Sequence, residues 1–165
     1  MSYYRPSWDD YFMAMARIVA TRSTCDRLRA GAILIKNKRI LSTGYNGAPP
    51  GLPHCDSEAG HKLEGGHCIR TLHDAENALL QIAALGGMST EGATLYCTFS
   101  PCYHCAKKII AARITRVVCG AIYRDPTIKN LFASAGIKFE IHESDQKWHL
   151  LCSELFTKPL EHKLI

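Results

Sequence analysis

The residues of this chain best suited to metal chemistry are one histidine and two cysteines, carried by two short motifs. His73 begins the run His-Asp-Ala-Glu, and Cys102 and Cys105 lie in the run Ser-Pro-Cys-Tyr-His-Cys. Imidazole and thiolate groups are ligands that zinc prefers, and a catalytic zinc site uses three protein ligands and keeps a fourth position for water. The two motifs therefore predict a zinc site formed by His73, Cys102 and Cys105.

The spacing of the two cysteines fits one turn at the start of a helix. Residues three apart lie on the same helix face, and Pro101 is a residue type that favours the first turn. The helix dipole at this end also favours the thiolate form. A Cys-x-x-Cys pair alone is also typical of a redox couple or of two buried thiols. The upstream histidine is what favours zinc.

The reaction that such a site supports needs a carboxylate as well as a metal. Zinc lowers the pKa of a bound water toward neutrality, and the resulting hydroxide can attack C4 of a cytosine ring and displace ammonia. A carboxylate then carries the water's proton to the ring and to the departing amine. Zinc-dependent nucleobase deaminases place this glutamate two residues after the ligand histidine, but here that position is Ala75 and the next residue is Glu76.

A second set of possible ligands surrounds a segment rich in glycine, histidine and cysteine, from about residue 44 to 72. Loops of this length are uncommon in compact domains unless they are functional. A second, structural zinc is predicted to clamp it, with four candidate ligands: Cys25, Cys55, His67 and Cys68. His61 belongs to the same candidate cluster, and His54 and either of His67 and Cys68 compete for places in it. The alternative is that Cys25 is a core thiol and the histidines are solvent-exposed.

Helices and strands that alternate along the chain must position these residues. Helical spacing and capping residues predict helices that begin near residues 7, 73, 102, 127 and 144. Apolar runs predict strands over residues 32–35, 40–43, 93–98, 117–122 and 138–141. This order predicts an α/β fold, a three-layer α-β-α sandwich with a central mixed five-stranded sheet.

Composition indicates an ordinary globular domain, which we expect to span residues 1–165 as one unit with an insertion at about 44–72. Apolar residues make up 47% and charged residues 21% of the chain. We find no leader peptide or membrane span in the sequence, so the eight cysteines are expected to be metal ligands or core thiols in a cytoplasmic protein. Three of them lie in apolar runs and are predicted to be core: Cys97, Cys119 and Cys152. The net charge of +5 comes from scattered basic residues, which favours a small phosphorylated substrate over polymeric nucleic acid.

Beyond these motifs, the chain resembles the deoxycytidylate (dCMP) deaminase family over most of residues 7 to 142. The likeness rests on five segments in the family's order and spacing: 23–25, 31–36, 43–49, 66–71 and 100–105. The resemblance implies a cytidine deaminase-like fold and the zinc-dependent hydrolysis of dCMP to dUMP in pyrimidine nucleotide biosynthesis. It further implies a homohexamer, possible regulation by dCTP and dTTP, and, as in some relatives, a second zinc.

The resemblance also sharpens the question of the missing acid. The family motif His-Ala-Glu-x-Asn-Ala aligns with residues 73–78 without a gap, which implies that Ala75 stands where the family has its proton-carrying glutamate. In one hypothesis the acid has been lost, by drift or by replacement, and the chain holds substrate without converting it. In the other, Glu76 takes over. A shift of one residue turns a side chain about 100° around the helix, so we favour the lost acid and expect Glu76 to be a solvated or intersubunit charge.

Substrate contacts follow partly from the resemblance and partly from residue chemistry. The resemblance implies that three residues line the sugar and the base: Asn46, Phe99 and Ser100. Tyr123 comes directly after an apolar strand and is suited either to stack on the base or to pack in the core. Guanidinium groups match phosphate bidentately, so Arg27 and Arg124 are predicted to bind the phosphate unless they are simply solvated.

Two other functions remain open at this stage. One is a catalytically silent, zinc-containing protein that binds or senses nucleotides. The other is a deaminase of another cytosine nucleotide or nucleoside. An enzyme acting on RNA or DNA needs an extended basic and aromatic groove, and no run of residues in this chain predicts one.

Overall fold

A mixed five-stranded sheet forms the centre of the computed structural model, which describes residues 5–144 and 146–157. The strands are β1 (Gly31–Lys36), β2 (Arg39–Tyr45), β5 (Thr94–Cys97), β6 (Arg116–Cys119) and β7 (Lys138–Ile141), in the order β2-β1-β5-β6-β7. β1 pairs antiparallel with both β2 and β5, whereas β5, β6 and β7 run parallel. The predicted mixed sheet is confirmed.

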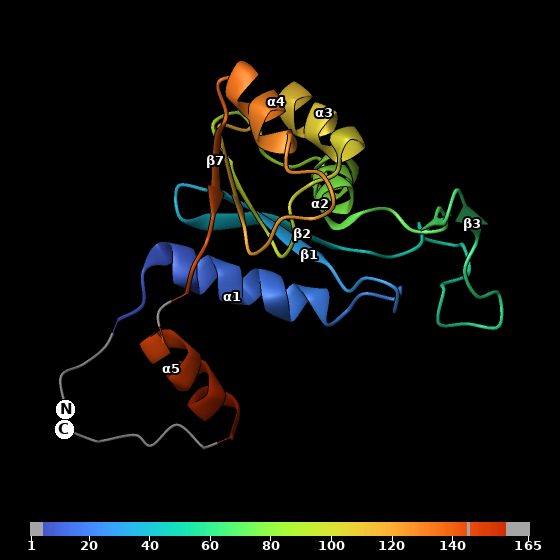
Figure 1. Cartoon of the computed structure of the whole chain (residues 1–165), viewed down its shortest axis with the longest axis horizontal. Helices are drawn as coiled ribbons and strands as arrows, with labels where there is room; N and C mark the ends of the chain where they lie inside the picture. The colour runs from blue at the N-terminus through green and yellow to red at the C-terminus, as the bar shows by residue number, and fades with distance from the viewer. Residues whose placement is uncertain (1–4, 145, 158–165) are drawn as a thin grey trace.

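Helices cover both faces of this sheet (Figure 1). α1 (Trp8–Ala20) lies on one face, and α2 (Asp74–Ala84), α3 (Tyr103–Ala111) and α4 (Ile128–Ser134) lie on the other. α5 (Gln146–Thr157) follows β7 and lies on the α1 side of the molecule. The three-layer architecture is therefore confirmed. Among the described residues, no helix has the length and apolar character needed to cross a membrane.

Alternate residues of the central strands serve two separate cores. Ile33 and Val118 pack toward α1, while their neighbours Leu34 and Val117 pack toward α2, α3 and α4. Because helices cover both faces, these strands are apolar throughout rather than alternating with polar residues. Two of the three predicted core cysteines are buried there, Cys97 and Cys119. The prediction for Cys152 was wrong: it is only half-buried, because α5 lies outside the three layers.

Two features of the sheet bring the motif residues to one edge. β5 and β6 are parallel, so the segments that follow them, which carry Cys102 and Tyr123, emerge at the same edge. Gly44 of β2 lies directly against the first turn of α2, and a Cβ atom at this position would overlap the Asp74 carbonyl and the Ala78 backbone. The missing side chain thus lets the start of α2, with His73 before it, rest on the sheet.

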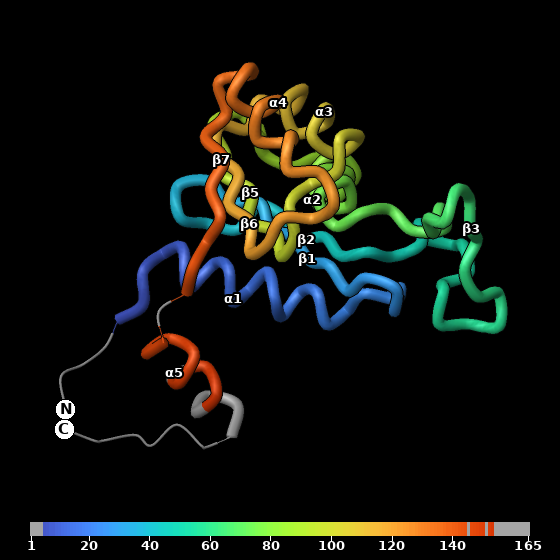
Figure 2. The backbone as a smooth tube through the Cα atoms, in the orientation of Figure 1, coloured from blue at the N-terminus to red at the C-terminus, as the bar shows by residue number. Residues whose placement is uncertain are grey.

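The segment between β2 and α2 extends away from the sheet, as the smooth trace in Figure 2 shows. It contains one small hairpin, β3 (Leu63–Glu64) and β4 (His67–Cys68), which the sequence analysis did not predict. Its turn is Gly65-Gly66, with φ angles of 53° and 78°. A glycine pair is the usual signal for such a turn, but strands of two residues leave no apolar alternation to recognise.

Candidate metal centre and nucleotide pocket

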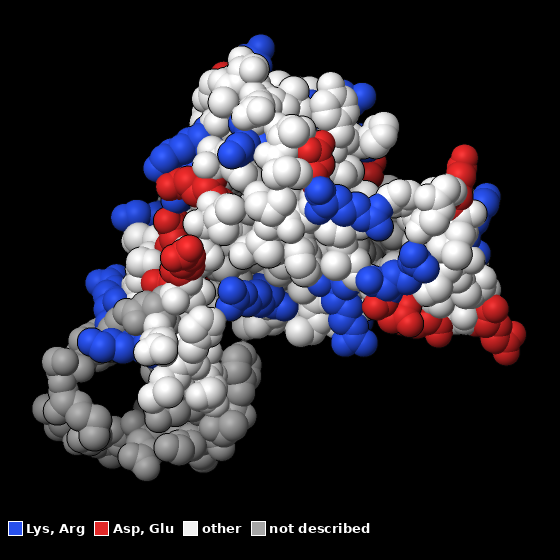
Figure 3. Space-filling view, viewed as in Figure 1, with Lys and Arg blue, Asp and Glu red and all other residues white. Residues whose placement is uncertain are grey.

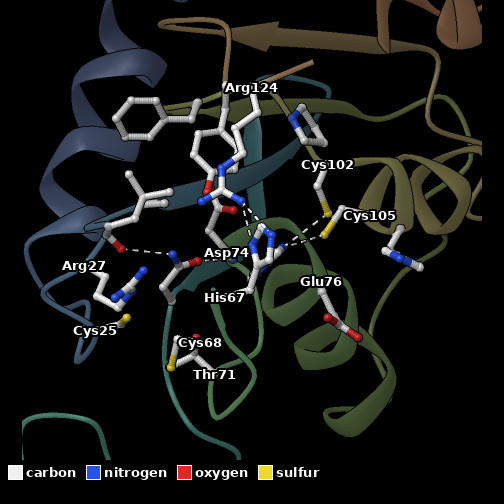
Figure 4. Close-up of a pocket in the computed structure, with 18 of the residues that line it drawn as sticks. Cys25, Arg27, His67, Cys68, Thr71, Asp74, Glu76, Cys102, Cys105 and Arg124 are labelled. Carbon is white, nitrogen blue, oxygen red and sulfur yellow. Dashed lines mark hydrogen bonds between the residues drawn. The ribbon is translucent and has the colours of Figure 1, made fainter. Parts of the chain in front are cut away.

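Two helix N-termini bring together the three ligands predicted for the first metal site. His73 caps α2. Cys102 caps α3, and Cys105 lies in the first turn of α3 (Figure 4). Nδ1 of His73 lies 3.4 Å from the Cys102 sulfur and 3.5 Å from the Cys105 sulfur. The three donor atoms all lie within 4.8 Å of one another.

This arrangement fits zinc. Zn–S bonds of about 2.3 Å and Zn–N bonds of about 2.0 Å in a tetrahedron separate donor atoms by roughly 3.5 Å, which matches the distances from His73. Hydrogen bonds from Cys105 and from His73 lower the pKa of Cys102 to about 3. The same contact with Cys102 raises the pKa of His73, and the pKa of Cys105 is raised by Cys102 and by burial. A cation held by His73, Cys102 and Cys105 would favour the thiolate forms of the cysteines and the neutral form of the histidine.

The two positions discussed for the acid lie in different surroundings. Ala75 is buried and belongs to the core packed against the sheet. The Glu76 carboxylate forms an ion pair with Lys108 of α3, although Glu76 also lines the cavity described below. The lysine partner could not have been found from sequence, because it lies 32 residues away.

Asp74 adds a carboxyl group that the sequence analysis did not consider as a candidate. It is buried, and its amide donates a hydrogen bond to Oδ1 of Asn46 at 2.9 Å. Its Oδ2 atom has no hydrogen-bond partner within the part of the chain that the structure describes. Burial raises the pKa of this carboxyl to about 6, even though the amide of Ala75 favours the ionised form. The signal available in the sequence was an acidic residue at the family's alanine position.

The structure places a second cluster of donors in the long segment, but with one ligand changed. The cluster comprises Cys25, Cys55, His61 and Cys68, whose donor atoms all lie within 4.8 Å of one another. His61 thus stands where His67 was predicted. His67 and Cys68 are successive residues of β4, and successive side chains of a strand point to opposite sides. Only one of the two can face the cluster.

The donors of this second cluster also suit zinc. The sulfurs of Cys55 and Cys68 are 3.5 Å apart, and Nδ1 of His61 lies 4.0 Å from the Cys25 sulfur. Nε2 of His61 lies 2.8 Å from a carboxylate oxygen of Asp26. A carboxylate on the far nitrogen of a histidine is the usual way to hold Nδ1 toward a metal. Three thiols and one imidazole form a closed set, as expected for a structural rather than a catalytic ion.

A cavity of about 930 Å³ opens beside the His73 site. The three ligands of the first site line this cavity. So do all six residues predicted to touch substrate: Asn46, Phe99, Ser100, Tyr123, Arg27 and Arg124. Its size is typical of small-molecule sites, and its aromatic and charged lining suits a compound with a ring and an anionic group.

Within the cavity, two polar side chains form hydrogen bonds with the backbone, and two aromatic rings lie beside each other. Nδ2 of Asn46 donates to the Leu28 carbonyl at 3.0 Å, so both polar atoms of its side chain already have protein partners. The hydroxyl of Ser100 accepts from the amide of Tyr123 at 2.7 Å. The rings of Phe99 and Tyr123 lie edge to face, 6.3 Å apart. Tyr123 therefore faces the cavity rather than packing in the core.

Comparison with known proteins agrees with this geometry. The family model for the cytidine and deoxycytidylate deaminase zinc-binding region matches residues 6–121. ComE operon protein 2 of Bacillus subtilis is 42% identical over 143 residues, which cover 86% of this chain and 75% of that protein. The deoxycytidylate deaminase of Saccharomyces cerevisiae is 37% identical over 139 residues, 81% of this chain, and the match spans only 44% of the yeast protein. A cyanophage S-TIM5 dCMP deaminase solved with dCMP and dUMP superposes with a TM-score of 0.74 at 31% identity, covering 85% of this chain and 100% of that one.

Proposed function

This chain belongs to the cytidine and deoxycytidylate deaminase family, and from that premise we propose that its reaction is the hydrolytic deamination of dCMP to dUMP. The observation that carries the proposal is the convergence of one imidazole and two thiols beside a cavity lined by aromatic rings and arginines. The similar cyanophage enzyme, crystallised with both dCMP and dUMP, supports the same substrate and product.

In this proposal His73, Cys102 and Cys105 hold the catalytic zinc. When bound, the ion lowers the pKa of a water molecule and supplies the nucleophile for C4 of the ring. Phe99 and Tyr123 hold the ring, while Ser100 fixes the Tyr123 backbone through its hydroxyl. Water would add across the N3–C4 double bond, with its oxygen on C4 and one proton on N3; the C4–N bond then breaks, and the amine leaves as ammonia with the second proton as C4 becomes a carbonyl.

The family's proton carrier is the part that this chain lacks at its usual place. We propose that Ala75 marks a lost acid and that the chain binds substrate but converts it slowly. The ion pair between Glu76 and Lys108 supports this, because a carboxylate engaged with an ammonium on the neighbouring helix is not free to serve the water. The same observation favours the second candidate function, a nucleotide-binding protein that keeps the fold and the metal without turnover.

Substrate selection is proposed to follow the chemistry of the cavity. Asn46 is assigned to the sugar, and Arg27 and Arg124 to the 5′-phosphate. A polymeric nucleic acid is not expected, since Lys and Arg side chains are interspersed with Asp and Glu on the face shown in Figure 3 rather than gathered in one stripe. A cytosine nucleoside or another cytosine nucleotide is the alternative substrate.

A second, structural zinc is proposed at Cys25, Cys55, His61 and Cys68. Its closed donor set and the carboxylate behind His61 support this assignment. The three cysteines of this cluster can bind a metal only while they are reduced, and cysteines stay reduced in the cytoplasm. The proposed zinc site is therefore consistent with the proposed cytoplasmic location.

Assembly and regulation are proposed from the family likeness. Leu85 and Met88, which follow α2, are large apolar side chains that remain exposed, which is typical of an interface between subunits. We therefore propose a homohexamer of one-domain subunits, with dCTP and dTTP as candidate regulators. Light scattering coupled to gel filtration, with and without each nucleotide, measures the assembly.

The test of the function is ammonia release from dCMP by this chain and by Ala75→Glu, with zinc content determined for both. Release confined to Ala75→Glu supports a deaminase that has lost its acid. Tight dCMP binding without turnover in either protein favours the silent nucleotide-binding protein. Rapid release by the unchanged chain, abolished by Glu76→Gln, contradicts the lost acid.

A further inference from the structure

The β3–β4 hairpin places His67 in the cavity, against Arg124 (Figure 4). Nη1 of Arg124 lies 2.6 Å from Nδ1 and 2.9 Å from Nε2 of His67. The guanidinium also covers the ring of Tyr123, 4.9 Å from its centroid. All three residues line the cavity. His67 therefore belongs to the pocket, and its neighbour Cys68, which also lines the cavity, belongs to the second cluster of metal-binding side chains.

Arg27 approaches the same hairpin from the other side. Its Nη2 atom donates to the carbonyl of Gly66 at 2.9 Å, and its side chain lines the cavity. Among the described residues, neither Arg27 nor Arg124 forms an ion pair with a carboxylate. A guanidinium can only donate hydrogen bonds, and a neutral imidazole donates one. These three side chains thus present donors without an anion to receive them.

The backbone of Arg124 is also unusual. Its φ angle is +57°, in the left-handed region that is unfavourable for a residue other than glycine. Such conformations persist where the surroundings enforce them, and they cluster at ligand sites. The conformation supports a binding role for the side chain that follows Tyr123.

The metal cluster holds the hairpin that carries His67. Two paired strands of two residues each are too short to be stable alone. Cys55, His61 and Cys68 tie this segment to Cys25, which lies two residues before Arg27. The cluster therefore fixes one neighbour of His67 and the loop that carries Arg27.

We propose that the β3–β4 hairpin, clamped by this cluster, is a phosphate-recognition arm in which His67 binds the 5′-phosphate together with Arg27 and Arg124. His67 then selects a nucleoside monophosphate over the free nucleoside. The inference rests on the proposed function and deepens it, since it names the residue and the clamp that recognise the phosphate.

Calorimetric titration of the full chain with dCMP and with deoxycytidine tests the role of His67. His67→Ala is expected to weaken dCMP binding about 10-fold or more, as for loss of a hydrogen bond to a charged group, and to leave deoxycytidine binding unchanged. His54→Ala is the matched control, because His54 is an exposed histidine of the same segment that does not line the cavity. The pair dUMP and deoxyuridine repeats the comparison without turnover.

Cys55→Ser tests the clamp, since Cys55 belongs to the cluster but does not line the cavity. It should lower the zinc content and reproduce the selective loss of dCMP binding, and combining it with His67→Ala should add nothing further. If Cys55→Ser does not fold, the comparison of His67→Ala with His67→Gln tests the inference. His67→Gln keeps a hydrogen-bond donor and is expected to bind dCMP more tightly than His67→Ala does.

The inference is overturned if His67→Ala weakens the binding of dCMP and of deoxycytidine to the same extent, or if it weakens neither. If the unchanged chain binds dCMP and deoxycytidine equally, the phosphate is not recognised and only this inference fails. If the unchanged chain binds no cytosine compound, the proposed function fails with it.

Discussion

The carboxylate of Glu76 is ion-paired with the ammonium of Lys108, which joins α2 to α3 beside the His73 site. Glu76 lies one residue beyond the family's acid and stands at the edge of the cavity. Its partner is an exposed lysine on the neighbouring helix. We infer from the pair that Glu76 has a structural rather than a catalytic role.

If this structural role is correct, Glu76→Gln leaves slow ammonia release from dCMP within about twofold of the unchanged chain, because general acid–base catalysis supplies about 100-fold or more and should be absent here. The variant should lower the melting temperature slightly, since partly exposed ion pairs contribute about 0–1 kcal/mol. Lys108→Met is the matched control, because it breaks the same ion pair from the lysine side and keeps the Glu76 carboxylate. A 100-fold fall in Glu76→Gln alone contradicts the assignment.

Restoring the family acid should restore turnover. Ala75→Glu is expected to raise the rate constant for dCMP deamination by about 100-fold or more, the usual contribution of a positioned acid–base group. Ala75→Gln, which has the same length without the proton-carrying group, should not. Stopped assays of ammonia at saturating dCMP, with zinc content matched, measure the difference.

The side chain of Asp74 is expected to lower the free energy of unfolding. Its Oδ2 atom is buried without a hydrogen-bond partner among residues 5–144 and 146–157, and an unsatisfied buried polar group costs about 1–3 kcal/mol. Asp74→Ala is therefore expected to raise the free energy of unfolding by about 1 kcal/mol. Asp74→Asn keeps an unpaired polar atom and serves as the control. A lower melting temperature in Asp74→Ala would show that the carboxyl group has a partner in solution.

Substitution of one zinc-binding residue at a time should show that the two proposed zinc sites are independent. Cys102→Ser should abolish one equivalent of bound zinc and leave the long segment protected from amide hydrogen exchange. Cys55→Ser should remove the other equivalent and expose that segment, because a closed structural site contributes directly to folding. Elemental analysis combined with hydrogen exchange tests both. Equal exchange profiles in the two variants would contradict two independent sites.

The close approach of Gly44 to α2 predicts a severe defect on substitution. A Cβ atom there meets backbone atoms of Asp74 and Ala78, which cannot move aside as a flexible side chain can. Gly44→Ala is expected to destabilise the fold by about 1–3 kcal/mol through overpacking and to lower zinc binding, since α2 carries His73. Gly87→Ala is the comparison for the loss of a glycine, because its φ is not in the left-handed region and the atom nearest to an added Cβ, at 3.1 Å, belongs to the Ile82 side chain.

Acid stability should depend on Asp9. A hydrogen bond from Arg116 lowers the pKa of Asp9 to about 2, below its ordinary value of 3.8. Because the folded pKa is the lower one, this contact stabilises the fold above about pH 4, and the contribution is lost as the pH falls toward 2. Asp9 is about one-third exposed, so solvent screening reduces the effect to about 1 kcal/mol. Urea denaturation of Asp9→Asn between pH 2 and 7 should show a flatter profile.

Local sequence was sufficient to identify the α/β order, the mixed sheet and the three side chains that meet at the first candidate metal site. Each of those inferences depends on short-range spacing: alternating apolar runs, a cysteine pair one helical turn apart, and a histidine at a helix start. Such patterns act within one element or between neighbouring elements. They are therefore readable before the chain is folded.

Contacts between distant residues were decided only by the tertiary structure. The strand geometry of β4 turned His67 toward Arg124 and left His61 to join the cysteines, although both histidines suit zinc equally well by chemistry. The packing of α2 against α3 paired Glu76 with Lys108. The packing of α2 against the sheet placed Asp74 beside Asn46 and Gly44, where one of its oxygens has no partner among the described residues. Side-chain direction and long-range pairing arise only when separate elements pack, so no spacing along the chain encodes them directly.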